Sequence, residues 1–135
     1  LWLQNMRVNV IAAARLTALC LPLLKKSAAA TVLYTGSSAG LQPTAYWGAH
    51  AVSKAALLSL VQITADEWEN VYPHLRVNLL IPHAVHTTSR MKSHPGEDKR
   101  LLPQLADLMP CYLNAMLEHA AYKSGEVIAC QSAAS

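Results

Sequence analysis

The stretch "ATVLYTG", residues 30 to 36, decides the fold class of this chain. It is short and apolar, it contains several β-branched residues, and it ends at a glycine. This is the pattern of a strand that is buried on both faces. The stretch "LRVNLLI" (75 to 81), stopped by Pro82, has the same pattern, and "GEVIAC" (125 to 130) predicts a third strand.

Helical patterns separate the three predicted strands. Residues 2 to 25 predict a long helix that is apolar on nearly all faces, 44 to 70 a second helix, and 101 to 119 a third, interrupted at Pro110. "GSSAGLQP" (36 to 43) and the polar stretch 82 to 100 are interpreted as loops. Helices alternating with strands predict an α/β fold with a parallel sheet and helical crossovers.

Only three strands are expected, which is half of a doubly wound domain. Such a sheet exposes an apolar edge. The chain also opens at Leu1, inside an apolar pattern and without a methionine. We therefore interpret residues 1–135 as one partial domain and expect it to belong to a longer protein.

Composition excludes several classes of protein. Hydrophobic residues make up 53% of the chain and charged residues 14%, which indicates a packed core. The net charge of +3 comes from scattered residues, so no basic stripe predicts nucleic-acid binding. The apolar run 8 to 24 contains Asn9, Arg15 and Pro22, and we interpret it as a buried helix of a soluble protein rather than a membrane span.

The three cysteines, Cys20, Cys111 and Cys130, are widely spaced and odd in number. The sequence has no CxxC pair, so the pattern predicts neither a disulfide framework nor a zinc knuckle. A reducing cytoplasm is the expected location.

Four motifs occur in one order along the chain: "RVNV" (7 to 10), "VLYTGSSAG" (32 to 40), "VSKAAL" (52 to 57), and "RVNLLIP" (76 to 82) with "VHTT" (85 to 88). Together they resemble the short-chain dehydrogenase/reductase family. The segment "YWGAHAVSK" (46 to 54) is similar to "NWGAYAVSK" of a bacterial branch of oxidoreductases. The resemblance covers nearly the whole chain. It implies a Rossmann-type fold and hydride transfer between NAD or NADP and a carbonyl or alcohol.

The resemblance also implies a catalytic set. Asn9, Ser37 and Lys54 match the family's asparagine, serine and lysine. The family's tyrosine position, thirteen residues after Ser37 and four before Lys54, is His50, and residues four apart share one helix face. Tyr46, about two turns before Lys54, does not replace it. An imidazole titrates near about 6.5 and a phenol near about 10, so the departure falls on the proton donor.

The nicotinamide side of the site is also implied by the resemblance. Lys54 is expected at the ribose, and Pro82, Val85 and Thr87 around the nicotinamide and its phosphate. His83 stands where the family has a glycine. Glycine lets a backbone approach a ligand closely, so we expect His83 to crowd the pocket or to reshape the turn.

The phosphate-binding loop of the family has no counterpart in this chain. Its glycines are Gly36, Gly40, Gly48, Gly96 and Gly125, and none forms GxxxGxG. That loop supplies most of the pyrophosphate contacts, so we expect the chain by itself to be inactive and to bind NAD or NADP weakly or not at all. The alternative function is a non-catalytic remnant that dimerises through helices 2–25 and 44–70, which form a four-helix bundle between subunits in the family.

Two other chemistries stay open at this point. "GSSAG" fits GxSxG, with Ser38 as the nucleophile of a serine hydrolase, although a loop is expected where a helix is needed. His50, His83 and His86 would lie at one sheet edge and suit zinc, but no carboxylate accompanies them, and we expect no metal. His94 is interpreted as a surface residue.

Overall fold

The computed structural model describes residues 1–117 and 122–130. Three segments, α1 (Trp2–Met6), the π-helical η1 (Arg7–Ile11) and α2 (Ala12–Leu24), form one continuous helix. The remaining elements are β1 (Ala30–Thr35), α3 (Ser38–Leu41), α4 (Gly48–Glu69), β2 (Leu75–Ile81), α5 (Thr88–Ser93), the 3₁₀ turns η2 (Lys99–Leu101) and η3 (Leu105–Leu108), α6 (Met109–Met116) and β3 (Val127–Ala129).

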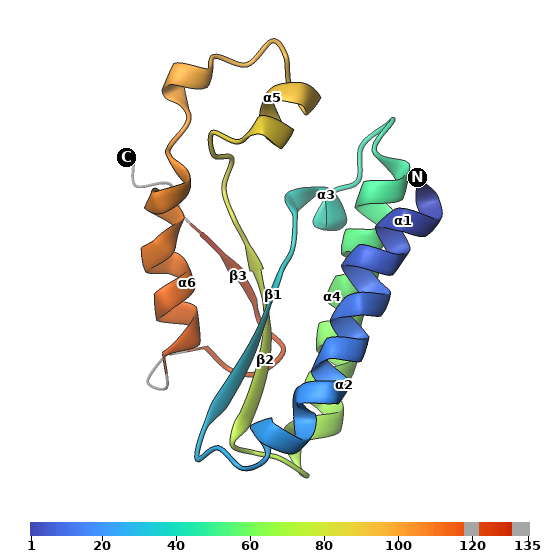
Figure 1. Ribbon diagram of the computed structural model, residues 1–135, viewed down its shortest axis with the longest axis vertical. Coiled ribbons are helices and arrows are strands. Elements are labelled where there is room, and N and C mark those ends of the chain that lie inside the picture. Colours follow the sequence, from blue (N-terminus) through green and yellow to red (C-terminus); the bar gives the residue numbers. More distant parts are fainter. Residues whose placement is uncertain (118–121, 131–135) are drawn as a thin grey trace.

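The sheet is parallel, in the order β1-β2-β3. β1 pairs along its whole length with β2, from Ala30 opposite Leu75 to Thr35 opposite Leu80, and β3 pairs with the last three residues of β2. Parallel strands need crossover connections, and α4 and α6 supply them (Figure 1). The predicted α/β fold is confirmed.

Helices cover both faces of this sheet. The continuous helix α1–α2 and α4 lie on one side, and α6 lies on the other (Figure 1). Side chains alternate along β2, so Val77, Leu79 and Ile81 pack with α4, whereas Leu80 packs with α6. Because both faces of β2 are covered, nearly all its residues are buried, as its continuous apolar pattern predicts.

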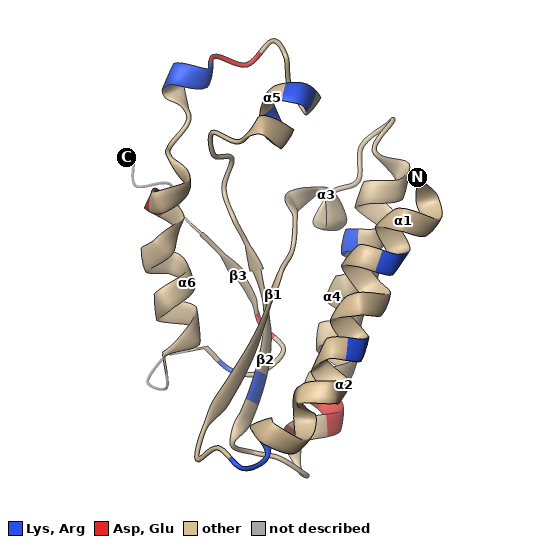
Figure 2. Ribbon diagram, in the orientation of Figure 1, with Lys and Arg blue, Asp and Glu red and all other residues tan. Residues whose placement is uncertain are grey.

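The long helix differs from its prediction. None of the residues of α1, η1 or α2 is buried, because this helix contacts α4 and β1 on one side only. Its other side exposes Leu16, Leu19 and Leu23. Figure 2 shows how few charges it carries. In the single chain, the helix that was predicted to be buried is therefore exposed along one side. By length and composition alone, Trp2–Leu24 is apolar enough to cross a membrane, a test that the core helix of a soluble protein also passes.

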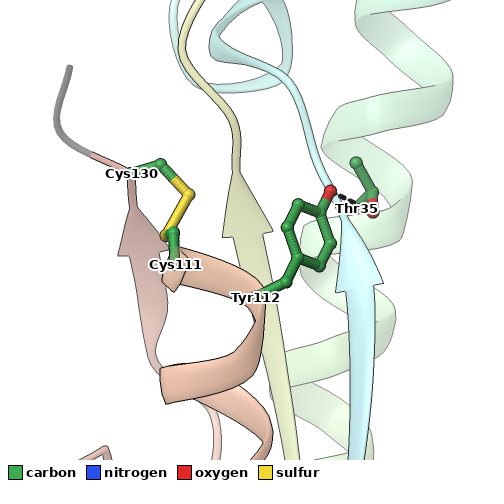
Figure 3. Close-up of a disulfide and its surroundings, with 4 residues drawn as sticks. All are labelled: Thr35, Cys111, Tyr112 and Cys130. Atoms are coloured by element: carbon green, nitrogen blue, oxygen red, sulfur yellow. Dashed lines mark hydrogen bonds between the residues drawn. A yellow bond between two sulfur atoms is a disulfide. The ribbon is translucent and has the colours of Figure 1, made fainter. Parts of the chain in front are cut away.

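The interpretation of the cysteines is also corrected. Cys111 in α6 and Cys130 directly after β3 form a disulfide, with their Cα atoms 5.8 Å apart (Figure 3). Their separation of 19 residues carries no motif. The packing of α6 against the end of β3 is what brings the two cysteines together. Cys20 is free and exposed.

Several boundaries move relative to the sequence patterns. A turn of helix, α3, replaces part of the loop 36 to 43, and α5 with η2 lies inside the predicted loop 82 to 100. The second helix begins at Gly48 rather than 44, because Tyr46 adopts a positive φ of 70° that no helix accepts. The third helix is shorter than predicted, and its expected end at 118 to 119 lies outside the described residues.

Candidate functional site

A pocket of about 520 Å³ opens at the carboxyl ends of the three parallel strands. This edge is where ligands bind in open α/β sheets. The lining comes from the loop after β1, the start of α4, the segment after β2 and the end of β3. It includes Ser37, Trp47, His50, Pro82, His83, Val85, Thr87, Arg90, His94 and Cys130.

Ser37 and His50 meet in this pocket. Ser37 caps α3, and its Oγ accepts a hydrogen bond from the backbone N–H of Ala39 at 3.3 Å. His50 lies in the first turn of α4, with its Nε2 3.4 Å from Ser37 Oγ. Close packing of α3 on α4 makes this possible, because a Cβ at Gly40 would lie 2.8 Å from the backbone carbon of Lys54. The thirteen-residue spacing thus brings the two side chains together.

Lys54 lies one helical turn after His50. Its Nζ donates a hydrogen bond to the backbone carbonyl of Thr35, at the end of β1, at 2.8 Å. Burial lowers the pKa of Lys54. Burial and, to a smaller extent, the charge of Lys54 lower the pKa of His50. The imidazole is therefore held in its neutral form at pH 7.

Asn9 does not line the pocket. Its Nδ2 donates to Ser53 Oγ at 2.8 Å, and Ser53 Oγ donates to the backbone carbonyl of His50 at 2.9 Å. Ser53 is fully buried in α4. Asn9 is thus linked to His50 through Ser53, a residue of the motif "VSKAAL" for which the sequence predicted no role. Its only signal is a small polar residue three positions after His50 in the helix.

The predicted nicotinamide-side residues Pro82, His83, Val85 and Thr87 form one wall of the pocket. Val85 is buried, and Thr87 Oγ1 accepts the backbone N–H of Arg90 and caps α5. Both ring nitrogens of His83 are buried without a hydrogen-bond partner. A buried polar atom without a partner is costly, so this imidazole marks a place where a polar ligand group would be stabilised.

Sequence reasoning missed an aromatic and charged group beside His50. The Trp47 ring lies 5.7 Å from the His50 ring and 5.4 Å from the His94 ring, measured between centroids. His94, interpreted as a surface residue, lines the pocket. Arg90 binds Glu97 through two hydrogen bonds of 2.7 and 2.8 Å. No spacing signal predicts the contact of Trp47 with His94, because it depends on how α5 packs beside the start of α4.

The two other chemistries find little support in this geometry. His50 approaches Ser37 rather than Ser38, so the residue of the GxSxG pattern lacks the base that a nucleophile needs. Among the described residues, no three histidine, cysteine, aspartate or glutamate side chains are grouped to hold a metal ion.

Known proteins resemble this chain in sequence and in structure. The model of the short chain dehydrogenase family matches residues 1–98. The oxidoreductase YciK of Escherichia coli strain K12 is 42% identical over 124 residues, which are 92% of this chain and 48% of YciK.

Solved structures of short chain dehydrogenases are also similar to this chain. A short chain dehydrogenase from Escherichia coli CFT073 complexed with NADPH superposes with a TM-score of 0.89 at 40% identity, covering 97% of this chain and 53% of that protein. One from Pseudomonas syringae superposes with a TM-score of 0.88 at 38% identity, covering 96% of this chain and 52% of that protein. The chain therefore spans about half the length of these relatives.

Proposed function

The chain belongs to the short-chain dehydrogenase family, and from this premise we propose that it forms the catalytic half of an NADP-dependent oxidoreductase acting on a carbonyl or alcohol. The observation that carries the proposal is the contact of His50 with Ser37 in the pocket, with Lys54 one helical turn after His50 and bonded to the backbone carbonyl at the end of β1. The relative solved with NADPH favours NADP over NAD.

The residues of this chain fit the nicotinamide half of the cofactor. Lys54 would hold the ribose, Pro82, Val85 and Thr87 would surround the ring and its phosphate, and the unpartnered nitrogens of His83 would meet the polar carboxamide. A bound nicotinamide supplies hydride transfer. The chain contains no glycine-rich loop to hold the pyrophosphate, so binding of the whole dinucleotide needs such a loop from elsewhere.

The proton chemistry follows from the state of His50. In alcohol oxidation, its neutral Nε2 accepts the hydroxyl proton while Ser37 Oγ hydrogen-bonds the substrate oxygen. In carbonyl reduction, His50 must first be the imidazolium, whose Nε2–H protonates the substrate oxygen. Because the pKa of His50 is lowered, the imidazolium is scarce at pH 7, and the site favours oxidation there.

A chimera tests this proposal: this chain replaces the segment of YciK that it matches, and NADPH absorbance is followed with a panel of carbonyl substrates. We expect kcat/KM for reduction to fall as pH rises through a midpoint below 6.5, and oxidation by NADP⁺ to rise across the same midpoint. Ser37→Ala should lower both rates about 100-fold. If both rates stay constant between about pH 5 and 8, His50 is not the group that transfers the proton in this reaction.

The exposed apolar helix supports a second candidate function, a dimerising module. Helices apolar on two sides need a partner in water. We propose that α1–α2 and α4 pair with the same helices of a second copy, burying Leu16, Leu19 and Ile63, which are all at least half exposed in the single chain. Arg15, Gln62, Asp66 and Glu69 are candidates for the polar contacts of that interface. The absence of nucleic-acid and membrane partners and the cytoplasmic location stay predictions.

Sedimentation velocity tests the dimer. The chain is expected to self-associate at micromolar concentration, and the double variant Leu16→Glu/Leu19→Glu should sediment as a monomer, because each charge would be buried in the apolar interface. Leu101→Glu is the matched control and should leave the dimer intact. Leu101 is 81% exposed and lies in η2, outside the helices of the proposed interface. A compact monomer of the unmodified chain would contradict the proposal, and so would binding of the unmodified chain to phospholipid vesicles in place of self-association.

A further inference from the structure

The Cys111–Cys130 disulfide lies in the wall of the pocket. Cys130 directly follows β3, lines the pocket and is 8% exposed. Cys111 is half-buried in the first turn of α6. Figure 3 shows the bond joining that turn to the carboxyl end of β3. The covalent tie thus lies at the same sheet edge as Ser37 and His50, and on the opposite face from α4.

Few other contacts hold this end of α6. Tyr112 Oη lies 2.9 Å from Thr35 Oγ1 (Figure 3). The backbone carbonyl of the same Thr35 accepts the hydrogen bond from Lys54. Met109 and Leu113 of this short helix are about half exposed. Among the described residues, this end of the helix is therefore attached through an apolar strip around Ala115, the Tyr112–Thr35 hydrogen bond and the disulfide.

The apolar strip connects the disulfide to the segment after β2. One buried cluster contains Cys130, Ile128, Leu108 and Ala115 together with Val85. Val85 belongs to the wall formed by residues 82 to 94, which carries His83, Thr87 and His94 into the pocket. A shift of α6 would remove packing from Val85 and so loosen this wall, because a closely packed cluster does not tolerate a gap.

We propose that Cys111–Cys130 is a reversible thiol–disulfide site whose state controls the packing of the pocket wall 82 to 94. When the bond is closed, α6 and the turn η3 before it keep Ala115 and Leu108 in the buried cluster with Val85, and the wall is ordered. When a dithiol opens the bond, α6 moves away from β3 and the wall is loosened. Exposed disulfides are the labile or regulatory ones, and the partial exposure of Cys111 lets a thiol reach this bond in the pocket wall. This inference concerns the shape of the pocket and holds whatever reaction the pocket performs.

The exchange is balanced as follows. A thiolate of the dithiol attacks the more accessible Cys111 Sγ, the S–S bond breaks, and Cys130 leaves as a thiolate that takes up a proton. The second thiol of the reductant, as a thiolate, then attacks the first sulfur of the reductant, which is bonded to Cys111 in the mixed disulfide. Cys111 leaves as a thiolate and is also protonated. The chain gains two electrons and two protons, and the dithiol becomes a disulfide.

Hydrogen–deuterium exchange of the full chain, with and without dithiothreitol, tests the proposal. Reduction should speed amide exchange about tenfold or more in two segments, 109 to 116 and 85 to 94, because both lose packing. Exchange in α4 and in the centre of β2 should stay unchanged, and reoxidation should restore the slow rates. Mass spectrometry after alkylation measures the thiol count in parallel.

Cysteine variants separate the bond from the reagent. Cys111→Ser and Cys130→Ser should both exchange like the reduced protein without dithiothreitol, whereas Cys20→Ser, the matched control, should behave like the unmodified chain. If a variant fails to fold, reduction of the unmodified chain decides the question alone. Three alkylated thiols before reduction, a bond that resists dithiothreitol in the folded chain, faster exchange limited to 109 to 116, or global unfolding on reduction would each overturn the proposal.

Discussion

Replacing His50 by tyrosine is expected to raise the rate of carbonyl reduction, measured as kcat/KM in the chimera with YciK, by about 10- to 100-fold at pH 7. The phenol would start from the same turn of α4, where His50 Nε2 now lies 3.4 Å from Ser37 Oγ. The ammonium of Lys54, one turn away, would lower the pKa of the phenol and favour proton exchange with the substrate. An imidazole is mostly neutral at pH 7, whereas a phenol still carries its proton there, so the proton donor would be present in most molecules.

Tyr46→Phe is the matched control for this substitution. Tyr46 is 105% exposed and lies outside the helix, so loss of its hydroxyl should leave the rate unchanged. The pH dependence should also change, because the tyrosine variant no longer needs an imidazolium. If His50→Tyr has no effect and Tyr46→Phe abolishes activity, the proton donor has been assigned to the wrong residue.

The second large effect concerns cofactor affinity. By isothermal titration calorimetry, the chain by itself should bind NADPH and NADH at least about 100-fold more weakly than the chimera. In the proposed binding mode the residues of this chain contact the nicotinamide half of the cofactor, while backbone amides at a helix N-terminus supply most of the pyrophosphate contacts in this fold. No glycine motif of that kind occurs among the five glycines of the chain.

Two further titrations control this experiment. Lys54→Met in the chimera should weaken binding about tenfold, since one charged hydrogen bond to the ribose is lost. The same substitution in the isolated chain should not change the heat measured on titration with either dinucleotide. Micromolar affinity of the unmodified chain for either dinucleotide would contradict the prediction and would mean that residues of this half hold the pyrophosphate.

Much of the site followed from local patterns. Ser37 and the segment 82 to 87 each follow a predicted strand, and the carboxyl ends of parallel strands meet at one edge. His50 and Lys54 share a helix face because they are four residues apart. The predicted helix start at 44 was wrong, because the pattern does not reveal the positive φ of Tyr46. The short helix α5 was missed because the polar run around it has no helical periodicity.

The sequence by itself determined the three strands, the long helices between them, the parallel direction of the strands, and which side chains lie at the carboxyl edge. These features depend on neighbours along the chain, whose preferences a periodic pattern records. Only the tertiary structure decided that Cys111 bonds Cys130, that Asn9 reaches Ser53, and that Trp47 lies against His94. Each of these pairs joins residues from different elements, and its distance depends on how those elements pack against one another, which no local spacing encodes.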